Sequence, residues 1–324
     1  MYSYENILIL SLFFNGNYII NLMKSIIIYI NTASYPIFQR NTKTLIENYK
    51  HTIERHGLNI KVITVTGRRE GRNDYFEDII IDCDESEILK VNLEAIKIIS
   101  KDYNQYDIIV KQNTNTVLNL QLLQLFCDLE VFNDDFLYSI CYFNITGFPD
   151  TITFPSGMFF MSSLKIFDKI IEYEKNTIDY INQYFEEYDG TKNFDGRIQN
   201  ESIEKEYLNN CLRWKGMPDD IFIGITGSIQ NIYKRASIRG STLSEYKRMD
   251  EFIKKILENN ISIDYIAINC KMESCVDDNQ IILEEKWFRE NYEYKLIDSI
   301  CKLFDNSIIT KDMAYNLYLS QYFY

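Results

Sequence analysis

The residues with the clearest chemical potential are two adjacent carboxylates, Asp219 and Asp220, which follow Pro218 and precede an apolar run closed by Gly224. Proline suits the first turn of a helix, because its missing N–H leaves no hydrogen bond unmade there. The helix dipole favours acidic side chains in the same turn, so one interpretation is a plain acidic helix cap. The other is a carboxylate at the edge of a cleft that takes a proton from a substrate hydroxyl, as a general base does.

Other catalytic and metal-binding patterns are missing from the sequence. The two histidines, His51 and His56, lie five residues apart on a predicted helix, which is the wrong spacing for a shared metal face. Seven cysteines occur without a Cys-x-x-Cys, and the closest pair, Cys270 and Cys275, matches no common zinc spacing. We interpret them as free thiols in a reducing, cytoplasmic compartment. The glycine-rich motifs of dinucleotide- and ATP-binding folds do not occur.

Composition and charge limit the class of partner. The chain has 324 residues, of which 46% are hydrophobic, so it can bury a full core. Its net charge of −13 opposes binding to nucleic acid or to anionic lipid at long range. An anionic ligand would therefore need a local basic patch or a metal ion. The sequence does not predict an oligomeric state.

A short apolar run, 7–14, lies near the N-terminus and is interrupted by Asn15-Gly16-Asn17. It is shorter than the roughly twenty residues that a transmembrane helix needs. No basic residues precede it, as they would in a signal peptide. We therefore expect no transmembrane span and interpret residues 1–23 as an N-terminal extension. Association with a membrane through this run is the alternative.

The first half of the chain alternates between apolar runs of strand length and amphipathic segments of helix length. The expected strands are 25–30, 60–65, 78–81 and 107–110, and the expected helices are 36–57, 88–100 and 118–129. This alternation is typical of an α/β fold with a mostly parallel sheet. Ligands of such sheets bind beyond the carboxyl ends of the strands. Three loops are then candidates, namely 31–34, 67–72 and 111–119.

The second half is less regular. The expected strands are 136–145, 151–154, 157–161 and 261–268, and the expected helices are 164–173 and 244–258. The last fifty or so residues show no clear pattern. No repeat or low-complexity linker divides the chain, so we expect one continuous domain with a C-terminal tail.

Three motifs occur in a definite order. The first is a strand that ends at Lys111, with Asn113-Thr114-Asn115 after it and Asn119 as the last residue of the motif. The second is Phe154-Pro155-Ser156-Gly157, and the third is the acidic pair. In this order and spacing the chain, over about residues 24–230, resembles GT-A-fold glycosyltransferases. It looks most like the β-1,3-galactosyl/N-acetylglucosaminyltransferase and Fringe group.

The resemblance implies a fold and an activity. The fold is a GT-A (Rossmann-like, nucleotide-diphospho-sugar transferase) domain with a mostly parallel central sheet over residues 24–270, on which a helical or irregular tail, 271–324, packs. The activity is that of an inverting hexosyltransferase, which moves a sugar from a nucleotide-sugar, UDP-linked, to a hydroxyl of a glycan or protein acceptor. Asp220 is then the general base, and Asp219 its partner or a donor-sugar contact. Ser156 and Gly157 would lie against the acceptor or the sugar.

The resemblance also implies donor contacts. The loop after the first strand, where the family seats uridine, holds Thr32, Ala33 and Ser34, and Arg40 falls near a family arginine. The remaining expected donor contacts are Lys111, Asn113, Asn115, Lys234 and Arg235. We expect Lys234 and Arg235 to lie in a basic loop over the diphosphate. A second basic loop, with Arg68, Arg69 and Arg72, is the alternative source of positive charge.

The main departure from the family lies at Asn113-Thr114-Asn115, where the family has an acidic triplet that holds Mn²⁺ against the donor diphosphate. Asparagine offers a neutral oxygen, a weaker ligand for a hard cation. One interpretation is that the donor binds without metal, or with Mn²⁺ or Mg²⁺ held weakly by Asn113 and Asn115. The alternative is a non-catalytic GT-A-like module that binds glycan or protein.

Overall fold

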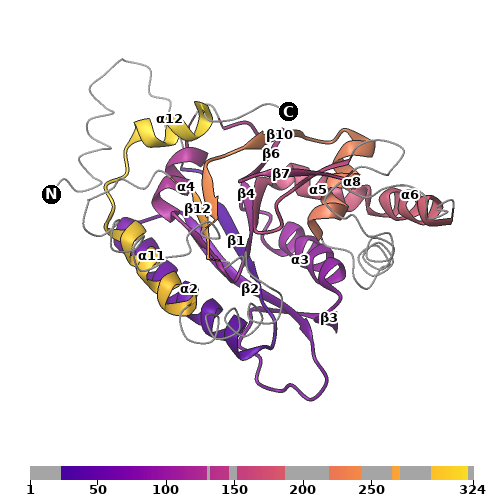
Figure 1. Cartoon of the computed structure of the whole chain (residues 1–324), viewed down its shortest axis with the longest axis horizontal. Coiled ribbons are helices and arrows are strands. Elements are labelled where there is room, and N and C mark those ends of the chain that lie inside the picture. Colours follow the sequence, from indigo (N-terminus) through magenta and orange to yellow (C-terminus); the bar gives the residue numbers. More distant parts are fainter. Residues whose placement is uncertain are drawn as a thin grey trace, which may run out of the picture.

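A seven-stranded sheet forms the centre of the molecule and carries helices on both faces (Figure 1). The computed structural model describes residues 23–129, 132–145, 152–186, 219–242, 265–270 and 293–319. The strands of this sheet are β1 Ile26–Asn31, β2 Ile60–Arg68, β3 Ile79–Asp84, β4 Ile108–Asn113, β6 Phe136–Ser139, β9 Phe159–Ser163 and β10 Lys234–Ser237. Their order across the sheet is β10-β6-β9-β4-β1-β2-β3.

Only β9 runs against the other strands of this sheet. β3, β2, β1 and β4 are parallel neighbours, β9 is antiparallel to both β4 and β6, and β10 is parallel to β6. A sheet covered on both faces needs apolar residues at every strand position, and Ile26 to Ile30 are all fully buried. The predicted fold class, α/β with a mostly parallel central sheet, is confirmed.

The helices divide between the two faces of the sheet. The helices on one face are α2 Pro36–His56, α4 Leu120–Cys127, α11 Tyr294–Asn306 and α12 Lys311–Leu319. Those on the other are α3 Ile88–Asp102, α5 Leu164–Glu172, α6 Glu174–Glu186 and α8 Asp219–Gln230. Alternate side chains of β1 serve the two cores, with Ile28 facing the α2 side and Tyr29 the α8 side. The site described below lies on the α8 side.

Two smaller sheets border the central one. β5 Thr116–Leu118, β12 Ala267–Asn269 and β11 Gly240–Thr242 form one of them, and the hairpin of β7 Tyr142–Ile145 and β8 Ile152–Pro155 forms the other. β8 packs along α8 and leads through Ser156, Gly157 and Met158 into β9. The hairpin therefore delivers the Ser-Gly motif directly to the end of the central sheet.

The C-terminal segment, which showed no clear pattern in sequence, includes two helices that belong to the main core. Leu296, Ile297 and Ile300 of α11 are buried against α2 and its neighbours. α11 is also tied to α2 by hydrogen bonds, among them that from the side-chain amide of Asn41 to Glu293, 3.1 Å long. The described part of the tail thus packs on the same body as the sheet.

Several expected boundaries differ from those observed. The expected strand 136–145 is two strands, β6 and β7, in two different sheets. The expected helix 118–129 begins at Leu120, because Asn119 caps it by accepting a hydrogen bond from the Leu122 N–H. The expected helix 244–258 and residues 1–22 lie outside the described residues. Across the described ranges, no helix combines the length and the apolar character that crossing a membrane requires.

Candidate functional site

The acidic pair and the end of β4 lie together, although they are far apart in sequence. Asp219 and Asp220 open α8, which covers the sheet face that carries Lys111. The Lys111 ammonium nitrogen lies 3.4 Å from Asp219 Oδ2, and the two side chains are only 2% and 8% exposed. Burying a charge without a partner is costly, so each of these groups makes the other tolerable.

Lys111 is a clamp between three segments. Its ammonium donates hydrogen bonds to Asn113 Oδ1, 2.8 Å away, and to the carbonyl oxygen of Gly157, and it pairs with Asp219. Its ammonium nitrogen also lies over the Phe160 ring, 5.5 Å from the ring centroid. These contacts join the end of β4, the turn before β9 and the start of α8, and they leave Lys111 beneath the surface of the site.

Asp220 is half-buried beside Gly157, and its environment makes it a stronger base than an ordinary aspartate. Burial and the neighbouring Asp219 carboxylate raise the pKa of Asp220 to about 6. Lys111 and backbone hydrogen bonds with Ile221 and Gly157 oppose part of that rise. Asp220 remains mostly ionised at neutral pH and can accept a proton from a hydroxyl.

Gly157 and Ser156 take different parts in this arrangement. Asp220 fills the space where a side chain at position 157 would lie, since an added β-carbon would be 2.7 Å from Asp220 Oδ2. Ser156 is buried, and its backbone N–H donates to Ser139 Oγ and to the carbonyl oxygen of Cys141. Ser156 therefore fixes the turn, while Gly157 provides room for the carboxylate.

The loop after β1 lies at the same end of the sheet, but its hydroxyls are already engaged. Thr32 is buried and accepts a 3.1 Å hydrogen bond from Thr42. Ser34 donates from its backbone and its hydroxyl to Glu85, and Arg69 donates to the Ser34 hydroxyl. Ala33 is partly exposed between them. Loop backbone, rather than free hydroxyls, is what this segment offers a ligand.

The other expected cations do not reach the acidic pair. Arg40 projects from α2 over the ring of Tyr294, 4.9 Å from its centroid. Lys234 and Arg235, expected in a loop, begin strand β10 instead. Because β10 and β6 run in the same direction as β4, the first residues of β10 lie at the amino ends of the strands, whereas Asn113 lies at the carboxyl end of β4. Arg235 donates to Ser228 Oγ there.

No protein-family model matches the sequence, and no curated protein matches it. Among solved structures, a similar chain is a glycosyltransferase involved in the glycosylation of the major capsid of PBCV-1. The two chains are 10% identical, the match covers 82% of this chain and 98% of that chain, and the TM-score is 0.37. A structural likeness this weak is no evidence of function, so the function is inferred from the geometry of the site.

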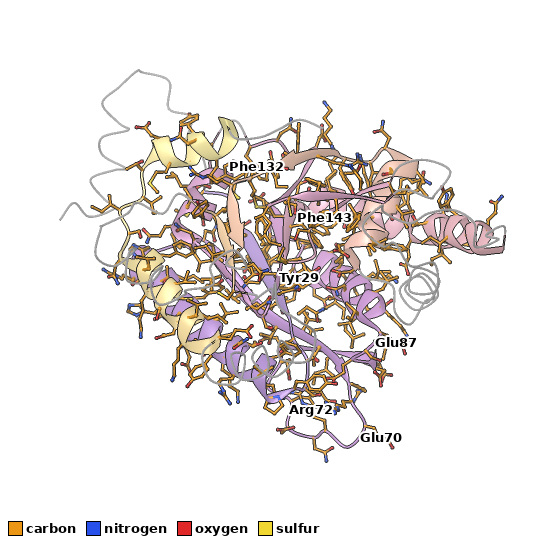
Figure 2. The ribbon with its side chains drawn as sticks, in the orientation of Figure 1. Tyr29, Glu70, Arg72, Glu87, Phe132 and Phe143 are labelled. Carbon is orange, nitrogen blue, oxygen red and sulfur yellow. The ribbon has the colours of Figure 1, made fainter. Side chains whose placement is uncertain are left out.

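Tyr29 is a member of the site that the sequence did not reveal. It is the register partner of Lys111 on the neighbouring strand, lies near the centre of the molecule (Figure 2) and is fully buried. Burial, with a contribution from Asp219, raises its pKa well above the usual value. Its hydroxyl has no hydrogen-bond partner within the described ranges. A tyrosine inside an apolar run was the available signal, because alternation places it on the face of Lys111.

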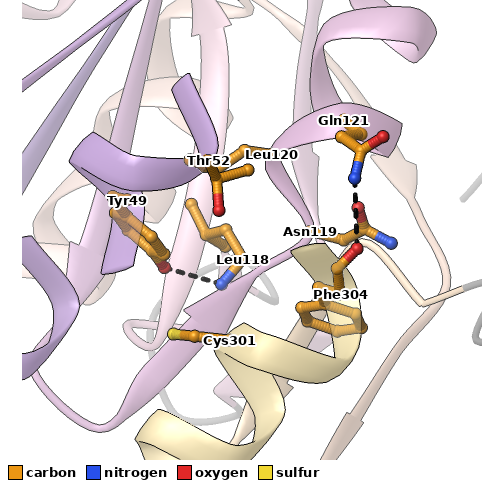
Figure 3. Close-up of a pocket in the computed structure, with 8 residues that line it drawn as sticks. All are labelled: Tyr49, Thr52, Leu118, Asn119, Leu120, Gln121, Cys301 and Phe304. Atoms are coloured by element: carbon orange, nitrogen blue, oxygen red, sulfur yellow. Dashed lines mark hydrogen bonds between the residues drawn. The ribbon is translucent and has the colours of Figure 1, made fainter. Parts of the chain in front are cut away.

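A pocket between α2, α4 and α11 lies on the other face of the sheet (Figure 3). Its volume is about 10 Å³, enough for a single water molecule. Tyr49 at its wall accepts a 2.7 Å hydrogen bond from the Leu118 N–H, and Gln121 donates to the carbonyl oxygen of Phe304. These groups bind the helices together, and none of them belongs to the acidic pair.

The resemblance assigns a metal to Asn113 and Asn115, and each of these residues has an oxygen in a hydrogen bond within the chain. The side-chain oxygen Oδ1 of Asn113 accepts from the Lys111 ammonium, and the backbone carbonyl oxygen of Asn115 accepts from the Cys270 N–H. Among the residues that the structure describes, no three His, Cys, Asp or Glu side chains are grouped to hold a metal ion. What the site does offer is a base, a glycine beside it and a buried ion pair beneath.

Proposed function

We propose that this protein is an inverting glycosyltransferase that moves a sugar from a nucleotide-sugar, UDP-linked, to a hydroxyl of a glycan or protein acceptor. One observation carries the proposal: the Asp220 carboxylate, with a pKa of about 6, faces Gly157 beside the carboxyl end of β4. The carboxyl ends of parallel strands are where α/β folds bind nucleotides and other ligands.

The proposed step needs one base. Asp220 removes the proton from the acceptor hydroxyl as that oxygen bonds to the anomeric carbon of the donor sugar. The bond from that carbon to the phosphate oxygen breaks on the opposite side, the nucleotide diphosphate leaves with the electron pair, and the configuration inverts. At pH 7 a carboxylate with a pKa of about 6 is about nine-tenths ionised, so Asp220 is ready to accept the proton.

Asp219 supports this role without sharing it. Its carboxylate is committed to Lys111, 3.4 Å away, and is buried. Its negative charge is nevertheless the second cause of the raised pKa of Asp220, after burial. Asp219 therefore tunes and positions the base, while Asp220 faces the substrate.

The test is to incubate the protein with a panel of nucleotide-sugars and candidate acceptors, in Mn²⁺ and in EDTA, and to follow nucleotide release. We expect Asp220→Asn to lose about 10²- to 10⁴-fold in rate, the usual contribution of a general base. The matched control is Asp135→Asn, since Asp135 is an exposed carboxylate before β6, at the amino ends of the strands rather than at their carboxyl ends. Equal turnover in both variants would remove Asp220 from the mechanism.

A second candidate is a GT-A-like module that binds glycan or protein without turnover. The observation that favours it is Asn113-Thr114-Asn115 in place of the family's acidic triplet. Nucleotide binding by the wild-type protein with no release from any donor would support this candidate. Absence of any thermal shift with every nucleotide would overturn the transferase proposal.

A further inference from the structure

The orientation of the Asn113 side chain follows from its contact with Lys111. Asn113 ends β4 and lies two residues after Lys111, so both side chains project from the same face. An ammonium group only donates, so the Asn113 atom 2.8 Å from it is the carbonyl oxygen. The side-chain N–H₂ therefore points away from Lys111. Asn113 is partly exposed, and its N–H₂ donates no hydrogen bond to another of the described residues.

A divalent cation does not fit this arrangement. Its ligands would be oxygens, and the Asn113 oxygen is already held by a fixed positive charge. Lys111 Nζ is surrounded by oxygens of Asn113, Gly157 and Asp219, which is the kind of environment a cation would occupy. A metal ion sharing the Asn113 oxygen would sit within about 5 Å of the ammonium, where like charges repel strongly in a partly buried site. The ammonium is itself the cation of this site.

We propose that Asn113 binds an anion: its side-chain N–H₂, polarised by Lys111, donates to a phosphate oxygen of the donor, and no divalent cation takes part. Lys111 is too buried to touch a ligand, but a donor bound to one end of an amide strengthens the donors at its other end. The ligand class, a diphosphate, rests on the proposed function. The orientation of the Asn113 side-chain amide, with its oxygen toward Lys111 and its N–H₂ away, rests on the contact with Lys111 alone.

Substitution of Asn113 by aspartate replaces the N–H₂ donor with an oxygen acceptor. The carboxylate introduced by Asn113→Asp would still accept from Lys111, so the clamp and the fold are preserved, but its free oxygen would repel a phosphate instead of donating to it. The same oxygen would also create the acidic ligand that Mn²⁺ prefers. Alanine removes the donor without adding charge. The two variants thus separate loss of a hydrogen bond from a change of ligand preference.

The experiment measures binding of UDP, and separately of inorganic pyrophosphate, by titration calorimetry in EDTA and in Mn²⁺. For the wild-type protein we expect affinities that agree within about twofold in the two buffers. Asn113→Ala should bind about tenfold or more weakly in both, the loss expected for a hydrogen bond to a charged group. Asn113→Asp should lose binding in EDTA and regain part of it in Mn²⁺. Asn133→Asp, which adds the same charge in the exposed segment before β6, is the matched control and should behave as wild type.

The outcomes separate this inference from the proposed function. Wild-type binding that needs Mn²⁺ and disappears in EDTA would overturn the inference and leave the transferase proposal standing. Pyrophosphate binding that depends on Asn113, with no binding of UDP, would uphold the inference and count against the transferase. Unchanged affinity in Asn113→Ala, or no binding of either ligand by the wild-type protein, would overturn the inference.

Discussion

The carboxylate of Asp220 occupies the volume that a side chain at Gly157 would fill: a β-carbon at position 157 would lie 2.7 Å from Asp220 Oδ2 and 3.1 Å from its Cγ. A separation of 2.7 Å is shorter than β-carbons make with other heavy atoms, so the two positions are coupled. Glycine at 157 is therefore required by the place of the proposed base, and its backbone φ is not in the left-handed region.

Gly157→Ala should separate activity from stability. The new methyl group meets the mobile end of the Asp220 side chain, which can rotate away, so we expect the free energy of unfolding to change by no more than about 1 kcal/mol. The rotation moves the base from its position, and a misplaced base loses most of its effect, so turnover should fall about 10²-fold. Urea unfolding and nucleotide release measure the two quantities. An active Gly157→Ala would show that the base does not need its present place.

Asp220→Asn should make the protein more stable at neutral pH. The pKa of Asp220 is raised, so the folded state binds its proton more tightly than the unfolded chain does. Its contribution to stability is fully present below about pH 4 and is lost as the pH rises through 6. Asparagine has no charge to bury, so at pH 7 the variant should gain about 1 to 3 kcal/mol, and below about pH 4 the gain should vanish. Urea titrations at acidic and neutral pH measure the difference, and an equal effect at both would contradict the assigned cause.

The pH profile of the turnover rate should show an acidic limb caused by protonation of Asp220. A base must be ionised to accept a proton, so the rate should fall about tenfold for each pH unit below 6, where Asp220 becomes protonated. The rate measured against pH in Asp135→Asn should keep this limb. A flat profile between about pH 5 and 7 would assign the proton transfer to another group.

Much of the sheet was predictable because its signals are local. The continuous apolar run of β1 identifies a buried parallel strand, and α2 begins at Pro36 and ends before Gly57, whose φ of +61° suits glycine. The position of β9 was not predictable in the same way. It inserts antiparallel between β4 and β6, and no local pattern in Phe159–Ser163 encodes which strands it joins.

The sequence predicted which residues of the candidate site lie together better than it predicted the contacts between them. The motif order points to Lys111, Gly157 and the acidic pair, and the structure brings them together. Their hydrogen bonds join residues far apart in the sequence, so they depend on the tertiary structure. The sequence gives no sign that Lys111 is buried and bonded to Asn113 rather than open to a ligand. Lys234 was expected in a basic loop, but it begins the edge strand β10, which pairs with β6. This pairing depends on the tertiary structure and has no local signal in the sequence.

Removing Lys111 should destabilise the fold strongly. Lys111→Met keeps the length of the side chain but leaves the Asp219 carboxylate buried without its partner, which typically costs about 3 to 5 kcal/mol. The double variant Lys111→Met with Asp219→Asn removes both charges and should recover most of that loss. Lys165→Met, which deletes a lysine from an exposed pair with Asp135, should cost less than about 1 kcal/mol. Urea unfolding of the wild type and these variants tests the prediction, and a double variant no better than the single would argue against the ion pair.

Asp305 should hold α11 against α2 in a manner that depends on pH. The two histidines converge on it, with Nε2 of His51 3.7 Å and Nε2 of His56 3.2 Å from its carboxylate, and Arg55 donates to it. Burial alone would raise the pKa of Asp305, but a hydrogen bond from Thr52 and the charges of Arg55 and His56 lower it overall.

Because that pKa is lowered, the contribution of Asp305 to stability is present above about pH 4 and is lost as the pH falls below it. Asp305→Asn should therefore cost about 1 to 3 kcal/mol at neutral pH and much less at about pH 3. Lys302→Gln is the control, since Lys302 is exposed and its pair with Asp298 lies within α11, four residues along one helix. It should cost about 0.5 kcal/mol or less. Amide exchange along 294–306 would locate the effect, and faster exchange elsewhere but not in α11 would assign the destabilisation to another contact.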